Sequence, residues 1–173
     1  AGSAPNASNA PVNLKYIIFQ GEATIEEYQT GASTIVGQAN AAGAMTVGAV
    51  RYTKPGAPGA ITSESFSSYG GTPVNGVVRP KPDFAAPNGV NTTVPLGTND
   101  FDGDGFTNFF GTSAAAPHAA AAAALLIEAN RKYVNANGRL SSTEVRILLS
   151  STALDIDQPG FDNRSGAGFI QPM

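Results

Sequence analysis

A run of small residues that begins at Gly111 constrains the fold of this chain more than any other feature of its sequence. The segment 111–118 reads GTSAAAPH and continues into six further residues of alanine at 119–124 and then into Leu-Leu-Ile at 125–127. Alanine is the best helix former, and its small side chain lets a helix lie close against a sheet in a crowded interior. Gly111 permits a sharp backbone turn that a residue with a Cβ resists. We therefore expect a tight turn that leads directly into a long helix.

The start of this helix presents a hydroxyl group. Thr112 is expected to be the N-cap residue, which places Ser113 where unpaired N–H groups point outward and the helix dipole favours negative charge. A serine at such a position can attack a carbonyl carbon, and its own N–H can then help to hold the oxyanion. Ser113 is therefore the candidate catalytic nucleophile. The alternative is an ordinary capped, alanine-rich core helix.

The order Gly-Thr-Ser-x-x-x-Pro-His, followed by an alanine-rich helix, closely resembles the nucleophile motif of the subtilisin-like serine proteases, the subtilase family. In this resemblance Ser113 matches the catalytic serine. Other segments are similar to family segments and occur in the same order: AMTVGAV at 44–50, ESFSSYGG at 64–71, KPDFAAP at 81–87 and DNRSGAGFI at 162–170. One departure is Asn88, which precedes the Gly89 that would usually follow the proline directly.

The resemblance covers roughly residues 43–173 and implies an α/β fold. It identifies this segment as the C-terminal portion of a subtilisin-like peptidase domain, a three-layer fold with a mostly parallel sheet flanked by helices. Residues 1–13 have the composition of a linker or tail. Residues 14–42 include a strand-like run, LKYIIF at 14–19, but no motif places this segment, which we expect to belong to the same domain.

Two helices are expected in the second half of the chain. The first runs from 112 to about 134 and stops near Asn135–Gly138. The second begins at Ser141, where Ser141 and Glu144 have the spacing of a capping box and Leu140 and Val145 that of a hydrophobic staple. Its expected buried face is formed by Val145, Leu148, Leu149 and Thr152.

The base and acid that a serine nucleophile needs are missing from this sequence. The chain has 1 histidine, His118. A step of five residues turns its side chain roughly 140° away from Ser113 and moves it some 7.5 Å along the axis, so His118 is expected to be structural. The family's aspartate, base histidine and oxyanion asparagine precede the serine, and no segment here matches them. We therefore expect this chain alone to be inactive and the missing residues to come from an upstream part of the same polypeptide.

An acidic loop precedes the nucleophile motif. Asp100, Asp102 and Asp104 alternate before Gly105, like the first half of a calcium loop, but the twelfth position, where a bidentate glutamate is needed, is Gly111. Calcium binding is thus one possibility, and an acidic turn is the alternative. No cofactor is required. The remaining acids, Glu22, Glu26, Glu27, Asp155 and Asp157, could pair for glycosidic chemistry, but a solvated surface accounts better for them.

Charge and composition exclude several classes of function. The net charge is −3 with 10 basic residues spread singly, so neither nucleic acid nor a membrane surface is an expected partner. The sequence favours a serine endopeptidase fragment that acts on protein or peptide substrates and, by resemblance, is secreted or periplasmic. A sedolisin-type acid peptidase fragment and a catalytically degenerate binding module are the alternatives. Half of a parallel sheet would also expose an edge and an apolar face, which predicts association with its other half or a second copy.

Overall fold

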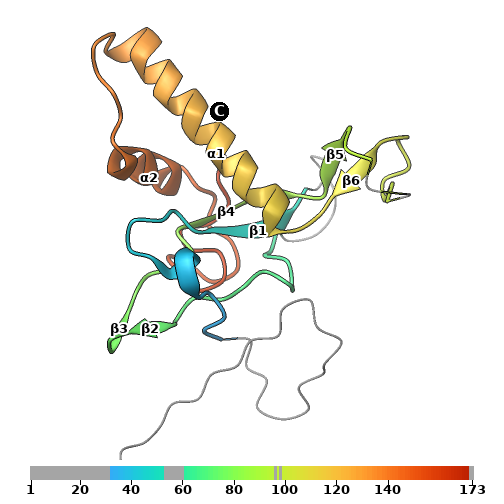
Figure 1. The fold of residues 1–173 in the computed structure, drawn as a ribbon, viewed down its shortest axis with the longest axis horizontal. Helices are drawn as coiled ribbons and strands as arrows, with labels where there is room; N and C mark the ends of the chain where they lie inside the picture. Colours follow the sequence, from blue (N-terminus) through green and yellow to red (C-terminus); the bar gives the residue numbers. More distant parts are fainter. Residues whose placement is uncertain (1–31, 53–60, 96, 98, 172–173) are drawn as a thin grey trace, which may run out of the picture. The chain divides into compact units, whose positions relative to one another are not determined.

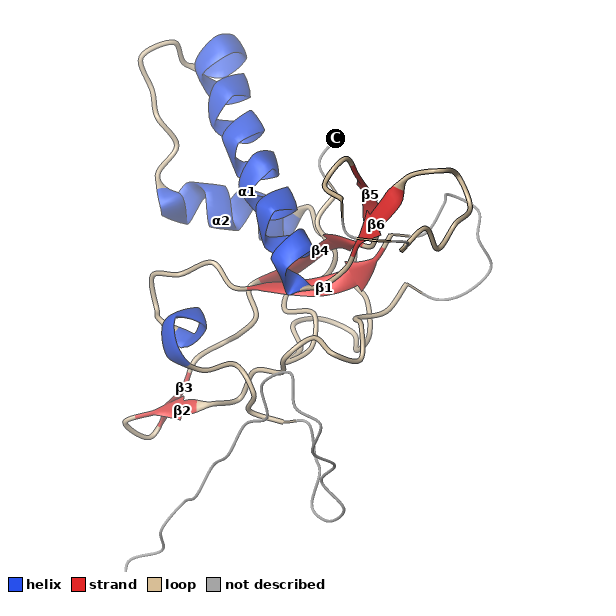
Figure 2. Cartoon of the chain, turned by 45° about the vertical axis from the view of Figure 1, so that its right-hand side comes forward, coloured by secondary structure: helices blue, strands red, loops and turns tan. Residues whose placement is uncertain are grey.

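The computed structural model describes residues 32–52, 61–95, 97 and 99–171 (Figure 1). The tail at 1–13 and the strand expected at 14–19 lie outside the described residues. Within the described part, a parallel strand pair packs against a long helix, and a second, shorter helix packs beside it (Figure 2). This arrangement of helix and parallel sheet confirms the α/β fold class.

The parallel pair consists of β1 (Val47–Arg51) and β4 (Phe84–Asn88), with Val47 opposite Phe84 and Arg51 opposite Asn88. Both strands overlap segments predicted from the sequence, although each begins three residues later and ends one residue later than the predicted segment. Their carboxyl ends lie at the same edge of the sheet, because parallel strands in register end together.

The two faces of the sheet bury alternate residues, as the period of a strand requires. Ala49, Phe84 and Ala86 face the helices and form one cluster with Ala115 and Ala119. On the other face Val50 and Ala85 pack against Ile156 and, less deeply, Ile61 and Phe169. Within the described residues, both α-helices therefore cover one face, and irregular segments cover the other.

The segment 162–170, predicted to be a strand, bonds to β4 only near its C-terminal end. The amide of Ala85 donates to Gly168 O at 2.8 Å, and the amide of Ile170 donates to Ala85 O at 2.9 Å. Its bridges to other segments are at Phe169, and a further bridge joins Asp162 to Gly166 within the segment itself. The first half of the segment is a turn closed by the Asp162 carboxylate, which accepts hydrogen bonds from the amides of residues 164 and 165. This part of the strand prediction is wrong.

The outer edge of β1 is also occupied. Glu64 donates its amide hydrogen to Ala49 O at 2.8 Å, and the Ala49 amide donates to Ser67 Oγ at 3.0 Å. The segment that contains Glu64 and Ser67 therefore covers the middle of the edge that the sequence led us to expect to be free.

Helix α1 (Thr112–Ala129) continues into a π-helical turn, η2 (Asn130–Val134), so the helical conformation ends where the sequence predicts. Its N-cap is Gly111, and no side chain caps it. The assignment of Thr112 as the N-cap is wrong, because the backbone already enters the helix at Thr112 and the glycine supplies the turn.

Helix α2 (Ser142–Ser151) begins with the predicted capping box. The Glu144 amide donates to Ser141 Oγ at 3.2 Å, and the Ser141 amide donates to the Glu144 carboxylate at 2.7 Å. Val145 and Leu149 are buried as expected. The prediction is wrong for Leu148, which is 38% exposed, and for Thr152, which is also exposed.

A buried ionic cluster ties α2 to the start of both central strands. The Asp83 carboxylate lies 2.7 Å from Lys81 Nζ and 3.0 Å from Arg146 Nε, and it accepts a hydrogen bond from the Thr46 amide. Lys81 and Asp83 are only 3% and 8% exposed, so their charges require these partners. The charged residues of the KPD sequence at 81–83 therefore have a structural role, because they pair with each other and with α2.

The smaller elements are η1 (Gly37–Asn40) and two antiparallel hairpins. One hairpin pairs β2 (Pro73–Val74) with β3 (Val77–Val78), and the other pairs β5 (Val90–Thr92) with β6 (Thr107–Phe109). The second hairpin carries the chain from the end of β4 to the start of α1. No helix in the described part combines the length and apolar character needed to cross a bilayer.

Candidate active site

The candidate nucleophile, Ser113, is the second residue of α1 and is exposed. The turn before it depends on Gly111, whose backbone has φ +118° and ψ 166°. This region is open essentially to glycine alone. A Cβ at Gly111 would lie 2.9 Å from the Ser113 Oγ, so any side chain here would crowd the hydroxyl as well.

Two contacts fix this turn to the end of β4. The Gly111 amide donates a hydrogen bond to Asn88 Oδ1 at 3.2 Å. The ring of Phe110 lies against Gly89, where a Cβ would meet the ring at 2.6 Å. Since β4 ends at Asn88, the start of α1 lies at the carboxyl end of the parallel strands, where α/β folds place their ligands.

The backbone amide of Ser113 differs from those of the two residues that follow it. The amides of Ala114 and Ala115 both bond back to Gly111 O, at 3.0 and 3.2 Å. The Ser113 amide finds no acceptor among the described residues, and it belongs to the first turn of α1, the positive end of the helix dipole. It can therefore donate to an oxyanion that forms on a carbonyl attacked by the same residue.

His118 turns back onto its own helix. Its Nδ1 lies 2.7 Å from Ala114 O. Because a carbonyl oxygen only accepts, Nδ1 carries the hydrogen in this contact. The ring is thus bound one helical turn away and does not contact the Ser113 hydroxyl, which agrees with the structural role expected from its spacing.

No base for Ser113 appears among the described residues, where its Oγ makes no hydrogen bond to a histidine or carboxylate. The carboxylate tied most directly to the turn is that of Glu64, which reaches it through Asn88 at 3.3 Å. The geometry supplies a nucleophile and one oxyanion donor. The sequence had shown Ser113 and Gly111, but nothing in its spacing pointed to Asn88 as a contact of the turn.

The acidic loop brings together the three carboxylates expected there. Asp100, Asp102 and Asp104 offer oxygens within 4.8 Å of one another, and all three are exposed. The Asp100 carboxylate accepts hydrogen bonds from the amides of Gly103 and Gly105, at 2.8 and 3.0 Å. These bonds account for the loop's conformation, and calcium binding here stays a prediction.

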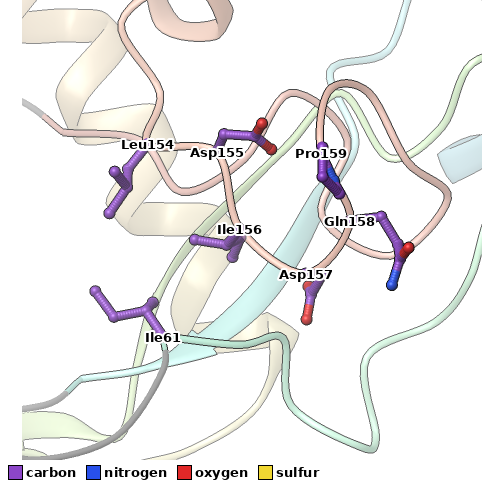
Figure 3. Close-up of a pocket in the computed structure, with 7 residues that line it drawn as sticks. All are labelled: Ile61, Leu154, Asp155, Ile156, Asp157, Gln158 and Pro159. Atoms are coloured by element: carbon purple, nitrogen blue, oxygen red, sulfur yellow. The ribbon is translucent and has the colours of Figure 1, made fainter.

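A hollow of about 400 Å³ lies away from the nucleophile turn, on the face of the sheet opposite α1 (Figure 3). Asp155 and Asp157, considered above as paired acids, both line it. Asp155 accepts from the Gly160 amide at 2.8 Å, and Asp157 accepts from Ser63 Oγ at 2.7 Å. Asp155 therefore holds a local turn, and Asp157 links its segment to Ser63.

Solved structures of subtilisin-related proteins share this fold. Fervidolysin from Fervidobacterium pennivorans, a keratinolytic enzyme related to subtilisin, is 26% identical with a TM-score of 0.51, over 78% of this chain and 19% of its own. Sphericase is 24% identical with a TM-score of 0.57, over 82% of this chain and 44% of its own. The CspB protease of Clostridium perfringens is 24% identical with a TM-score of 0.51, over 73% of this chain and 24% of its own. The chain thus spans less than half the length of each of these structures.

The sequence model of the Subtilase family matches residues 13–168. The match includes the segment 14–42, which its motifs alone did not place. No curated protein sequence gives a significant match to the chain. With the family match covering most of its length, the chain belongs to the subtilase family.

Proposed function

We propose that this chain is the nucleophile-bearing portion of a subtilisin-like serine endopeptidase. Ser113 Oγ attacks the carbonyl carbon of a peptide bond and forms an acyl-enzyme, while a histidine base takes the hydroxyl proton and passes it to the departing amine. Water then attacks the ester and releases the acid. No cofactor takes part, because side chains supply the nucleophile, base and acid.

One observation carries the proposal: Ser113 stands exposed at the second position of α1, with its own amide unpaired among the described residues. This is the placement that nucleophilic attack and oxyanion stabilisation both require. An ordinary capped core helix would instead satisfy its first amides with a side chain, and none does so here.

The base histidine, its aspartate and the oxyanion asparagine belong, in this proposal, to an upstream part of the same polypeptide. His118 is bound to its own helix, and the chain has no other histidine. The isolated chain is therefore inactive. By its family the whole protein acts on protein or peptide substrates and is secreted or periplasmic.

The alternatives are a sedolisin-type acid peptidase and a degenerate, protease-like binding module. The sedolisin pattern shares Gly-Thr-Ser but uses carboxylates as partners, so its activity peaks in acid, whereas a histidine base works near neutrality. The Pro117-His118 pair is more like the subtilisins. A binding module would keep the fold and lack the base throughout.

Covalent labelling with a fluorophosphonate probe tests the proposal. Ser113 Oγ displaces fluoride from phosphorus, and the base takes up the proton. We expect labelling of the polypeptide that includes its upstream sequence, none of residues 1–173 alone, and none after Ser113→Ala. If the longer polypeptide is folded and stays unlabelled, the binding-module alternative replaces the proposal.

A further inference from the structure

Asn88, the residue that departs from the family's pattern, is the residue that holds the nucleophile turn. Its side chain is completely buried, at 0% exposed, between the end of β4 and the start of α1. A buried side-chain amide needs partners for both its oxygen and its nitrogen. The partners it finds come from two segments far apart in the sequence.

These partners fix which way the amide points. The Gly111 N–H can only donate, so it faces Asn88 Oδ1 at 3.2 Å. The Glu64 carboxylate only accepts, so it faces Asn88 Nδ2 at 3.3 Å. A flipped amide would oppose donor to donor and acceptor to acceptor. Glu64 therefore holds the Asn88 oxygen toward the turn.

Glu64 is itself anchored. Its backbone amide donates to Ala49 O in the middle of β1 at 2.8 Å. The Asn88 backbone oxygen accepts from the Tyr52 amide at 2.7 Å, just beyond the end of β1. The connection from β1 through Glu64 and Asn88 to Gly111 thus starts from two residues whose backbones are bonded to β1 or to the residue that follows it.

The adjacent residue provides a second attachment. Gly89 makes room for the Phe110 ring, and its amide donates to Phe109 O at 2.8 Å. Asn88 and Gly89 together therefore hold Phe110 and Gly111, the residues that lead into Ser113. An attachment at two points fixes both the position and the direction of the first turn of α1.

We propose that Asn88 is a positioning residue for Ser113, with Glu64 setting the orientation of its amide. The inference rests on the proposed nucleophilic role of Ser113. An attacking oxygen must lie close to and in line with the carbonyl carbon, and a misplacement of about 1 Å costs roughly 100-fold in rate. Asn88 acts through the Gly111 amide, and it touches neither substrate nor reacting atoms.

An exchange of charge between the two side chains tests the connection. Asn88→Asp puts a carboxylate against Glu64, which breaks the bridge, and we expect fluorophosphonate labelling of the full-length polypeptide to slow by up to about 100-fold. Adding Glu64→Gln gives the new carboxylate an amide donor, so the double variant should recover most of the wild-type rate. A merely structural loss of packing would not be reversed by this second change.

The control is Asn40→Asp. Asn40 is also buried and donates to Thr72 O at 3.1 Å, but it lies away from the turn. We expect it to lower stability and to leave the labelling rate unchanged.

Hydrogen exchange at the Gly111 amide provides a measurement that does not need activity. It should be slow in the wild type and in the double variant and fast in Glu64→Ala, where the Asn88 amide is no longer oriented. Equal labelling rates for the wild type and Asn88→Asp, or a loss that the double variant does not restore, overturn the inference. Those outcomes leave the role of Ser113 standing, whereas a folded wild type that never labels removes both.

Discussion

At the scale of single residues, Gly111 determines both the backbone turn before α1 and the free space around the Ser113 hydroxyl. We expect Gly111→Ala to lower stability by about 1–3 kcal/mol, because its φ and ψ lie in a region essentially reserved for glycine. The new Cβ would also lie 2.9 Å from Ser113 Oγ. Fluorophosphonate labelling of the full-length polypeptide should therefore fall by about 100-fold or more.

Gly103→Ala is the matched control for this prediction. Gly103 also has a positive φ, +69°, but a Cβ there would meet nothing within 4 Å. This variant should be strained and still label at the wild-type rate. Equal loss of labelling in both variants would mean that strain alone, and not crowding of the hydroxyl, explains the effect of Gly111→Ala.

The site residues that could be predicted from the sequence are those whose contacts lie within a single element, and the residue that was missed makes contacts between distant segments. Ser113 and His118 could be assigned because one helix fixes their relation, through a rotation that any helix has. Asn88 was noticed only as a departure from a pattern. Its contacts with Glu64 and Gly111 join segments 24 and 23 residues away, and no periodicity along the chain encodes such a pairing.

At the scale of elements, the packing of α1 against the sheet depends on small side chains. Ala119 is 4% exposed and lies in the cluster with Ala49 and Phe84, whereas Ala120 is exposed. We expect Ala119→Leu to lower the free energy of unfolding by about 1–3 kcal/mol, because the helix must move away from the sheet. Ala120→Leu should change it little. Urea denaturation of both variants checks this, and equal losses would refute the close packing of α1.

The capping box of α2 predicts a pH dependence. Hydrogen bonds from the backbone amide and then the hydroxyl of Ser141 lower the pKa of Glu144 below the ordinary value of a glutamate. A carboxyl group whose pKa is lower in the folded state stabilises that state above the unfolded pKa and loses this effect as the pH falls through the folded value. The contribution of Glu144 should therefore be complete at neutral pH, begin to fall as the pH drops to about 4.3, the pKa of an unperturbed glutamate, and be lost once the pH is below the lowered pKa of the folded state.

Glu144→Gln keeps the capacity to accept a hydrogen bond but has no titrating group. We expect it to reduce the pH dependence of the urea midpoint in this acid range, and Glu144→Ala to lower the midpoint at neutral pH as well. Since Glu144 is fully exposed, both changes should be small. An unchanged pH dependence in Glu144→Gln would show that the box does not persist in solution.

The elements were predicted unevenly, for physical reasons. The start of α2 was predicted correctly because a capping box is a local pattern with local partners. The N-cap of α1 was assigned to Thr112 and is Gly111, because the glycine turn replaces a side-chain cap. The segment 162–170 looked like a strand, but the Asp162 carboxylate holds its first half in a turn. The sequence does not show which side chain will accept a hydrogen bond from a nearby backbone amide.

At the scale of the whole chain, the two helices and the turn that follows α1 expose several large apolar side chains. Leu125, Tyr133, Val134 and Ile147 are 62%, 75%, 80% and 58% exposed. Residues 119–127 of α1 are all apolar, and a helical stretch that is apolar all round is typical of a buried helix. The edges of the sheet offer less free surface for a partner than the sequence led us to expect, because residues 63–67 bond to the middle of β1.

We therefore expect residues 1–173 alone to self-associate through this helical surface. Light scattering should give a mass that rises with concentration, and Leu125→Lys with Ile147→Lys should lower it, because burying a charge without a partner is unfavourable. Ala32→Lys, at an exposed site far from α1 in the sequence, is the control for added charge. If the proposed upstream half belongs on this surface, supplying that half should reduce self-association and restore labelling of Ser113 together. A monomer at high concentration would mean that the exposed helical surface needs no partner, and the argument for a missing half would then depend on the absent base alone.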